Sequence, residues 1–300
     1  MPTDSQTFES YRPLLFSIAY RMLGSAMEAE DVVQEAFLRF APVQDARSAK
    51  AYLTTIVTRL CLDHLKSAKT QRETYIGDWL PEPVLTGDSP SAVAETHESI
   101  SMAFLVLLED LSPVERAIFL LREVFDYPYA EIAEIVDKSE ASCRQYYHRA
   151  KQFLADRRPR YEPSSAEQHK LVEEFLRVME SGDVEGLTEM LAEEVAFYGD
   201  GGGKVPAVQR PLFGRAAVVR FLLLGVFRLL PAGTEVRIAD VNGTQSILFW
   251  GEDSLYFVMN LAILDNKIAA IRNVLNPDKL TYIRQQWLRD NQLERLASKR

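Results

Sequence analysis

Apolar residues in the first half of the chain recur at the three- and four-residue spacing of amphipathic helices. One such stripe covers residues 11–23 and stops at Gly24, a residue type that commonly ends helices. The same spacing predicts helices over residues 27–40, 49–66 and 91–108. A further helix is expected from Ser112 to about Val124, because Ser112-Pro113-Val114-Glu115 forms a capping box with proline in the first turn. The first half is therefore predicted to be all-α.

Residues 129–154 have the spacing of a helix-turn-helix followed by a basic helix. The turn is Asp137-Lys138-Ser139: Asp137 tolerates the left-handed conformation of a tight helix end, and Ser139 is a good N-cap. On the helix that follows, the apolar seam is expected to contain Cys143, Tyr147, Ala150 and Leu154. The residues expected to face outward are Arg144, Gln145, His148, Arg149 and Lys151.

That outward face is rich in hydrogen-bond donors. Arg and Gln side chains can pair with guanine and adenine edges in a major groove, so Arg144 and Gln145 are expected to contact bases. Arg149 and Lys151 are expected to contact phosphates. The alternative is a solvated basic face on an ordinary helical hairpin.

Two earlier helices also carry polar faces. The helix over residues 27–40 presents Asp31, Gln34 and Glu35 on one side, a face that could equally be solvated. On the helix over residues 49–66, the side expected to face inward carries Tyr52, Leu53, Ile56, Val57, Leu60 and Cys61. The opposite side carries Thr54, Thr55, Thr58, Arg59, Asp63, His64 and Lys66. These side chains can hold one DNA strand by its backbone, and the alternative is a surface helix with a basic end.

The second half of the chain has a different pattern, which predicts helices followed by strands. Helices are expected over residues 167–180, 184–191 and 214–230, with a short strand at 195–198. Runs rich in β-branched and aromatic residues predict strands over 235–241, 246–250, 255–264 and 267–275. Turn sequences separate them, among them Asn242-Gly243 and Asp265-Asn266. Helices followed by an antiparallel meander predict an α+β cone, with a tail helix over residues 280–296.

Composition limits the class of protein. Three hundred residues suggest roughly two or three domains, and 47% apolar residues can form several cores. The net charge of −9 is unusual for a nucleic-acid binder, but basic residues concentrate in stretches 47–72 and 144–160. The two cysteines, Cys61 and Cys143, exclude a disulfide framework, and no metal-ligand spacing occurs. Without a signal pattern or long apolar run, the protein is expected to be soluble and cytoplasmic.

The order of these motifs resembles the extracytoplasmic-function sigma factors of bacterial RNA polymerase. The resemblance rests on DVVQEAFLRF from Asp31, AYLTTIVTRLCLDHLKS from Ala51, LSPVERAIFLLREVFDYPYAEIAEIV from Leu111, and the basic helix. It implies that Asp31, Gln34 and Glu35 bind the polymerase. It also implies that region two reads the −10 element, with Thr58, Arg59, His64 and Lys66 as expected contacts, and that region four reads −35.

The remaining chain is similar to the SnoaL-like branch of the NTF2-like fold. Three loop signatures resemble those of the sigma subgroup that carries such a domain, in which it is thought to tune activity. These are Trp79-Leu80-Pro81-Glu82-Pro83, Asp200-Gly201-Gly202-Gly203-Lys204 and Asn276-Pro277-Asp278-Lys279-Leu280. Trp79, Leu80 and Val84 are expected to dock on another part of the chain, the alternative being loose collapse.

The expected organisation is a multidomain chain with two all-α sigma domains and an α+β cone. Region two covers 1–70, a linker 71–90, region four 91–158, a second linker 159–166, the SnoaL-like domain 167–280 and a tail helix 281–300. The expected partners are core RNA polymerase and promoter DNA, together with an intramolecular contact of the C-terminal domain with region two or the linker. No cofactor, metal or membrane is expected, although an unknown small ligand is possible.

Two other functions stay open from the sequence. One is a ligand-responsive helix-turn-helix regulator that acts without being a polymerase subunit. The other is a pocket enzyme tethered to a DNA-binding module. Catalysis is not expected, because no histidine follows His169 and the carboxylates Asp200, Asp240, Asp253 and Asp265 lie mostly at predicted turns.

Overall fold

The chain forms two compact units. The computed structural model describes residues 4–40, 46–73, 75–86, 100–155, 157, 165–226, 230–252 and 254–297. One unit comprises Met1–Thr74 and Asp88–Arg158, and the other comprises Tyr75–Gly87 and Pro159–Arg300. The segment Tyr75–Gly87 therefore belongs with the C-terminal part of the chain although both of its neighbours in sequence belong to the first unit.

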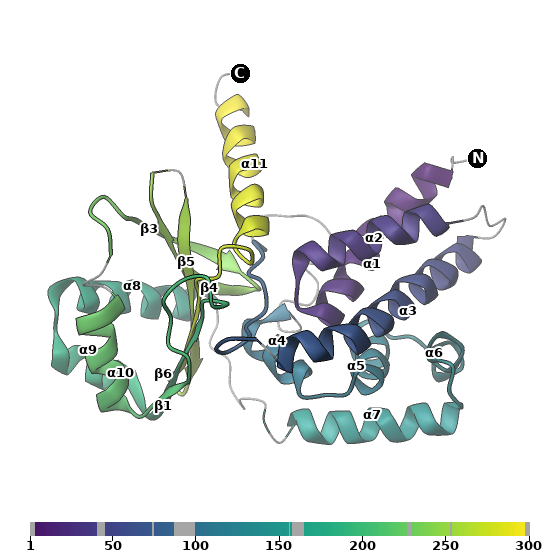
Figure 1. Cartoon of the computed structure of the whole chain (residues 1–300), viewed down its shortest axis with the longest axis horizontal. Coiled ribbons are helices and arrows are strands. Elements are labelled where there is room, and N and C mark those ends of the chain that lie inside the picture. Colours follow the sequence, from purple (N-terminus) through teal and green to yellow (C-terminus); the bar gives the residue numbers. More distant parts are fainter. Residues whose placement is uncertain are drawn as a thin grey trace. The chain divides into compact units, whose positions relative to one another are not determined.

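The first unit is helical throughout its described residues, as expected. Its helices are α1 (Asp4–Leu23), α2 (Ala26–Arg39), α3 (Ala46–Glu73), α4 (Met102–Glu109), α5 (Pro113–Phe119), α6 (Tyr129–Val136) and α7 (Glu140–Ala155) (Figure 1). A π-helical turn, Leu120–Val124, extends α5. The predicted capping box is present, because the Ser112 hydroxyl accepts from the Glu115 N–H and the Glu115 carboxylate accepts from the Ser112 N–H. Gly24, with φ of +69°, ends α1 as predicted.

Two expectations for this unit meet limits or corrections. Of the helix expected over residues 91–108, residues 91–99 lie outside the described residues, and Met102–Glu109 is helical. The expectation that Tyr52 faces inward is wrong, because its side chain is 40% exposed.

The second unit is an α+β cone built on one six-stranded sheet. Its helices are α8 (Ser165–Ser181), α9 (Val184–Met190), α10 (Arg215–Phe221) and α11 (Thr281–Ala297). Its strands are β1 (Leu191–Asp200), β2 (Leu212–Phe213), β3 (Glu235–Val241), β4 (Thr244–Trp250), β5 (Leu255–Leu264) and β6 (Lys267–Val274). The strand order is β2-β1-β6-β5-β4-β3. This arrangement confirms the predicted fold class.

The turns of the meander follow from local conformation. Asn242-Gly243 and Asp265-Asn266 have φ values of +54°, +68°, +49° and +56°, as two-residue hairpin turns with two left-handed residues require. Strands β3 to β6 are consecutive antiparallel neighbours, as predicted. The parallel pairing of β1 with β6 was not predicted. It places the end of β1, at Asp200, beside the end of β6, at Val274.

Helices α8, α9 and α10 cover one face of the sheet (Figure 1). Apolar side chains fill the space between them and the strands, including Phe175, Phe197, Ile247, Phe249 and Met259. Phe249 and Phe257 stack with ring centroids 4.1 Å apart. This core rigidly supports the loops at the ends of the strands. Among the described residues, no helix combines the length and apolar character of a membrane-spanning segment.

Candidate functional site

The helix-turn-helix is formed by α6 and α7. Asp137 has φ of +53° and ends α6, so the predicted left-handed turn is confirmed. The Ser139 hydroxyl accepts from the Ser142 N–H at 3.1 Å, which confirms Ser139 as the cap of α7. The predicted seam is also confirmed, since Cys143, Tyr147, Ala150 and Leu154 are all buried.

The outer face of α7 is as exposed as expected. Arg144, Gln145, His148, Arg149 and Lys151 are exposed. The Arg144 guanidinium lies 4.3 Å from the ring centroid of Tyr129 and pairs with Glu140 at 3.2 Å. Because ion pairs this exposed contribute little to stability, Arg144 can exchange Glu140 for a nucleic-acid acceptor at small cost.

Two other cations on α7 pair with carboxylates of α5 and of the π-helical turn that extends it. Arg149 pairs with Glu115 at 2.9 Å, and Lys151 pairs with Glu123 at 3.0 Å. Hydrogen bonds to the Tyr147 hydroxyl and to Glu123 raise the pKa of Lys151. Lys151 therefore stays charged at neutral pH. Contact of Arg149 and Lys151 with phosphates stays a prediction.

The face of α2 that carries Asp31, Gln34 and Glu35 points to solvent or is half-buried. Glu35 pairs with Arg39 of the same helix at 2.7 Å. Leu38, at 73% exposure, is a large apolar side chain left uncovered near the same end.

The polar face expected on α3 is only partly exposed. Thr54 and Thr58 have no exposed surface, so the expectation that they face outward is wrong. The Thr54 hydroxyl hydrogen-bonds the Tyr127 hydroxyl at 2.7 Å, and Tyr127 is itself buried. Threonine can enter such a contact because its hydroxyl finds a partner while its methyl group packs. His64 and Lys66 remain accessible, paired with Glu28 and Asp63.

Arginines connect the helices of the predicted regions two and four by capping helix ends. From α3, Arg59 donates to the carbonyls of Glu134 and Ile135, the last turn of α6, at 2.9 and 3.1 Å. From α5, Arg116 donates to the carbonyl of Met22, the last turn of α1, at 2.6 Å. Carbonyls at helix C-termini lack intrahelical donors and carry partial negative charge, so cations stabilise them.

Arg116 is 2% exposed and also pairs with Glu109 at 2.7 Å. Burial lowers the pKa of Arg116 to about 10, which leaves it charged at neutral pH. Sequence reasoning missed Arg116 and Tyr127. The one available signal was a charged residue at an inward position of α5, between Val114 and Ala117.

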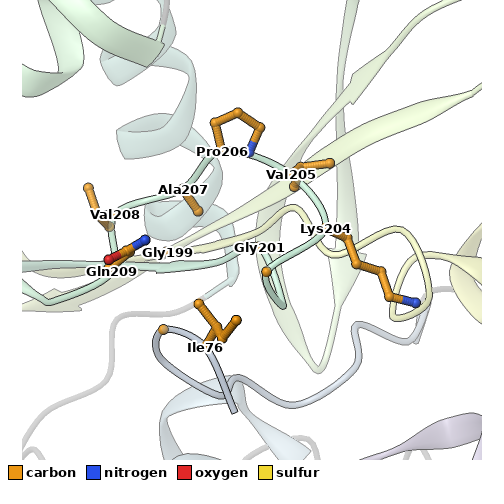
Figure 2. Close-up of a pocket in the computed structure, with 11 residues that line it drawn as sticks. Ile76, Gly199, Gly201, Lys204, Val205, Pro206, Ala207, Val208 and Gln209 are labelled. Atoms are coloured by element: carbon orange, nitrogen blue, oxygen red, sulfur yellow. The ribbon is translucent and has the colours of Figure 1, made fainter. Parts of the chain in front are cut away.

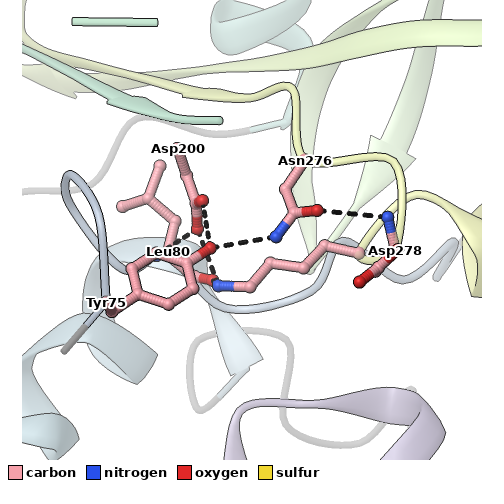
Figure 3. A network of polar contacts seen from close by, with 6 residues as sticks. Tyr75, Leu80, Asp200, Asn276 and Asp278 are labelled. Carbon is pink, nitrogen blue, oxygen red and sulfur yellow. Dashed lines mark hydrogen bonds and ion pairs between the residues drawn. The ribbon is translucent and has the colours of Figure 1, made fainter. Parts of the chain in front are cut away.

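A buried carboxylate organises the second unit. Asp200 has no exposed surface. It accepts hydrogen bonds from the Tyr75 hydroxyl at 2.5 Å, the Leu80 N–H at 2.8 Å and the Lys279 ammonium at 2.6 Å (Figure 3). Three donors from two distant segments of the chain thus converge on one side chain.

The Lys279 ammonium is shared between several groups. It donates to the Leu80 carbonyl at 2.5 Å and lies 4.1 Å from the ring centroid of Trp79. Asn276 donates to the Tyr75 hydroxyl at 3.0 Å, and its own side-chain oxygen accepts from the Asp278 N–H (Figure 3). Burial and the hydrogen bond to Asp200 raise the pKa of Tyr75, so the phenol stays protonated and can donate.

The segment 75–86 continues along the edge of the sheet. Leu85 and Val241 form an antiparallel bridge, and β3 is an edge strand. The Val84 carbonyl accepts from the Asn242 N–H at 2.9 Å, and the Thr86 N–H donates to the Asp240 carbonyl at 2.9 Å. Leu80, Pro81 and Val84 are buried, while Trp79 is half-buried. The segment therefore adds backbone hydrogen bonds to an open sheet edge, a common way to bind an extended peptide.

The glycines of the loop after β1 allow this approach. Gly202 has φ of +58°, and a Cβ built on it would lie 2.2 Å from the Asn276 side-chain nitrogen. Gly203 has φ of +70°, and its Cβ would lie 2.9 Å from Cδ1 of Ile76. Lys204, which follows them, pairs with Asp278. Pro277 is exposed.

Gly202→Ala is expected to lower the free energy of unfolding of the second unit by about 2–3 kcal/mol. Left-handed alanine costs about 1–2 kcal/mol, and the displaced Asn276 loses a hydrogen bond of about 1 kcal/mol. The measurement is urea unfolding followed by tryptophan fluorescence. All three tryptophans, Trp79, Trp250 and Trp287, lie in the second unit, so the signal reports that unit alone.

Gly233→Ala is the matched control. Gly233 has φ of +83°, but no atom of the described residues lies within 4 Å of its built Cβ. Its free energy of unfolding should fall only by the cost of placing alanine in the left-handed conformation, about 1–2 kcal/mol. Equal losses in the two variants would contradict the contact of Gly202 with Asn276 as the source of the difference.

The described residues contain no group of three or more His, Cys, Asp or Glu side chains placed to hold a metal ion.

Comparison with known proteins gives matches over both units. Residues 7–71 match the family model for Sigma-70 region 2, and residues 101–154 match that for Sigma-70, region 4. The chain is 38% identical over 288 residues to the ECF RNA polymerase sigma factor SigJ of Mycobacterium tuberculosis, covering 91% of this chain and 92% of that protein.

Two further comparisons cover almost the whole chain. The probable ECF RNA polymerase sigma factor SigI of M. tuberculosis is 30% identical, covering 94% of this chain and 96% of that protein. The crystal structure of M. tuberculosis SigJ superimposes with a TM-score of 0.75 at 35% identity, covering 92% and 97% of the two chains.

Proposed function

The chain belongs to the ECF sigma factors of bacterial RNA polymerase, and on that premise we propose how its parts divide the work of promoter-specific initiation. The polymerase-binding face is Asp31, Gln34 and Glu35 on α2. The −35 contacts are Arg144, Gln145, His148, Arg149 and Lys151 on α7, and the −10 contacts are Thr58, Arg59, His64 and Lys66 on α3. The observation that carries this division is the donor-rich outer face of α7, held by a fully buried seam.

The direct test uses the purified full chain and core RNA polymerase. The expected result is co-elution of the two, with initiation from a cognate promoter only when both are present. If the chain instead bound a specific duplex by itself and did not associate with the core enzyme, it would act as an ordinary helix-turn-helix regulator.

Arg144→Ala is expected to relax promoter discrimination at one base pair. Loss of a bidentate pair with guanine costs about 1–3 kcal/mol, roughly a 5- to 150-fold loss of preference. The measurement is initiation by reconstituted holoenzyme on promoters that vary singly across the −35 element.

Arg149→Ala is the comparison for that experiment. A lost phosphate contact should weaken every promoter alike and reduce the salt dependence of binding. If Arg144→Ala also weakened all promoters equally, Arg144 would be a phosphate contact.

The packing of α3 supports a closed form of the first unit in the absence of polymerase, that is, a form in which α3 contacts α6. Thr54 and Thr58 are buried, and Arg59 is bound to the end of α6. Contact of these residues with an unstacked −10 strand requires α3 to separate from α6. Polymerase binding would then shift the population toward the separated form, and the closed form would lower the apparent affinity.

The C-terminal unit acts, in this proposal, through the segment 75–86. That segment joins the two sigma regions in sequence, and its docking on Asp200 and on β3 fixes both of its ends. Docking therefore sets how far apart the two regions can move. No catalytic role is proposed for Asp200, because this buried carboxylate already accepts hydrogen bonds from three donors.

This regulatory role has its own test. A variant with a loosened segment, such as Asp200→Asn, should change the yield of specific transcripts in the reconstituted assay while association with core enzyme persists. Unchanged transcription with a demonstrably undocked segment would remove the regulatory role and leave the sigma-factor role intact.

A further inference from the structure

A pocket of about 520 Å³ lies between Ile76 and the loop that follows β1 (Figure 2). Its wall consists mainly of glycine backbone and aliphatic side chains, and Lys204 is the one charged residue among the described residues that line it. The Lys204 side chain extends away from the space (Figure 2) and pairs with Asp278. Charged and aromatic side chains instead meet where the outer face of α7 borders α6.

Two guanidinium groups lie against the ring of Tyr129, the first residue of α6. Arg144 of α7 places its guanidinium carbon 4.3 Å from the ring centroid, and Arg122 of the π-helical turn places its own at 5.2 Å. The face of an aromatic ring carries partial negative charge, so each contact is attractive. Tyr129 therefore holds one cation from each of two other elements.

The ring of Tyr129 is itself held in place. It is half-buried and meets the ring of the buried Tyr147 edge to face, with centroids 6.0 Å apart and an interplanar angle of 78°. Arg122 donates to the Tyr127 carbonyl at 3.0 Å, so this cation is fixed to the backbone beside the ring. Tyr129 thus presents an ordered surface to the outer face of α7.

Arg144 benefits from such support because its side chain is 56% exposed. A freely moving arginine has many rotamers, and their loss opposes binding. The hydrogen bond from Arg144 to Glu140, at 3.2 Å, uses the nitrogen Nη2. A guanidinium can rest on a ring by its flat face, which leaves its in-plane N–H groups available for a guanine edge. A ring contact therefore orders Arg144 and keeps its donors.

We propose that Tyr129 is a positioning residue for base readout by Arg144. The ring keeps the guanidinium in one orientation before DNA arrives, so less conformational freedom is lost when Arg144 pairs with a base. The benefit applies only to the base pair that Arg144 contacts. Tyr129 therefore contributes to discrimination at that base pair rather than to affinity for every promoter. This inference rests on the proposed function, in which Arg144 contacts a base edge.

A second pair of arginine and tyrosine on α7 gives a matched control. The Arg149 guanidinium lies 4.9 Å from the ring centroid of Tyr146, which is half-buried. Arg149 is expected to contact a phosphate, and phosphate contacts carry no sequence information directly. Loss of the Tyr146 ring should therefore weaken all promoters alike, whereas loss of the Tyr129 ring should reduce the preference at one base pair.

The first experiment measures initiation by reconstituted holoenzyme on promoters that vary singly across the −35 element. Tyr129→Leu is expected to lower the preference at the base pair that Arg144→Ala identifies by about two- to fivefold, the range for an exposed cation–π contact. Tyr129→Phe keeps the ring and should retain the preference. Tyr129→Leu combined with Arg144→Ala should show the preference of Arg144→Ala alone. Tyr146→Leu should leave that preference unchanged.

The second experiment detects the ring contact in the free full-length chain by nuclear magnetic resonance. Isotope-labelled arginine gives a side-chain N–H signal for Arg144, which is assigned by its absence from Arg144→Lys. The ring current of Tyr129 should shift this signal upfield. The shift should persist in Tyr129→Phe and disappear in Tyr129→Leu, while the helix band in circular dichroism confirms that each variant is folded.

Three results would overturn the inference: an Arg144 signal that Tyr129→Leu leaves in place, a Tyr129→Leu variant that weakens every promoter by the same factor, or equal losses of preference in Tyr129→Phe and Tyr129→Leu. Failure of the proposed function would look different. Arg144→Ala would then change no base preference in the parent chain, while the ring-current shift would persist as a contact without a role in readout.

Discussion

Asp200→Asn is expected to lower the free energy of unfolding of the second unit by about 3–5 kcal/mol. This is the loss typical when one partner of a buried ion pair is removed. The substitution keeps the size of the side chain but removes the Asp200 carboxylate from the Lys279 ammonium, whose side chain is 8% exposed. It also weakens the acceptor that holds the Tyr75 hydroxyl and the Leu80 N–H. The measurement is urea unfolding followed by tryptophan fluorescence.

A matched control and a double variant isolate the cause. Asp278→Asn changes the same residue type in the same loop cluster, but its pair with Lys204 is exposed, so a loss below about 1 kcal/mol is expected. The double variant Asp200→Asn with Lys279→Met removes the lysine charge as well. It should lose less than the sum of the two single variants, because residues in one pair are not additive. Strict additivity would mean that the ion pair is not what stabilises this site.

Arg116→Ala is expected to lower the free energy of unfolding of the first unit by about 3 kcal/mol, since it removes a buried cation that donates to two partly buried acceptors. These are the carboxylate of Glu109 and the carbonyl of Met22 at the end of α1. The measurement is urea unfolding followed by circular dichroism at the helix band. The first unit holds seven of the eleven α-helices in the described residues and none of the tryptophans.

Arg12→Ala is the control for this second variant. Arg12 pairs with Glu30 at 2.5 Å, but its side chain is 46% exposed, so a loss of at most about 0.5–1 kcal/mol is expected. The tryptophan signal of Arg116→Ala should also keep its midpoint, because the altered contacts lie wholly in the first unit. A loss in Arg116→Ala no larger than that in Arg12→Ala would rule out the buried contacts as a main fastening of α1 to α5.

Prediction from the sequence succeeded where the residues that determine a local structure all lie within one short stretch. Ser112 and Glu115 satisfy one another's backbone within one turn, and Asp137 and Ser139 end one helix and begin the next. The seam of α7 follows from the spacing of four residues alone. The same holds for the β3–β4 turn at Asn242-Gly243, whose two left-handed residues need no distant partner.

It failed on α3, where a local pattern has two solutions. A stripe of threonines is compatible with a solvated face and with a buried one, since a threonine hydroxyl is satisfied equally by water or by another side chain. The choice depended on Tyr127, which is 73 residues away from Thr54. No spacing within α3 contains that information.

By itself, the sequence determined most helices and strands of both units, although not β2. It also determined several caps and turns, the donor-rich face of α7 and the family, because each depends on neighbours within a few residues or on motif order. Only the tertiary structure decided that Arg59 and Arg116 cap helices of the opposite region, that β1 lies parallel to β6, and that Asp200 receives Tyr75, Leu80 and Lys279. The side-chain contacts join residues that are 75–125 positions apart in the sequence, and the strands β1 and β6 are separated by a similar distance along the chain. For the buried Arg116, Asp200 and Lys279, the physical reason is that burying a charge is unfavourable unless the fold brings it a partner.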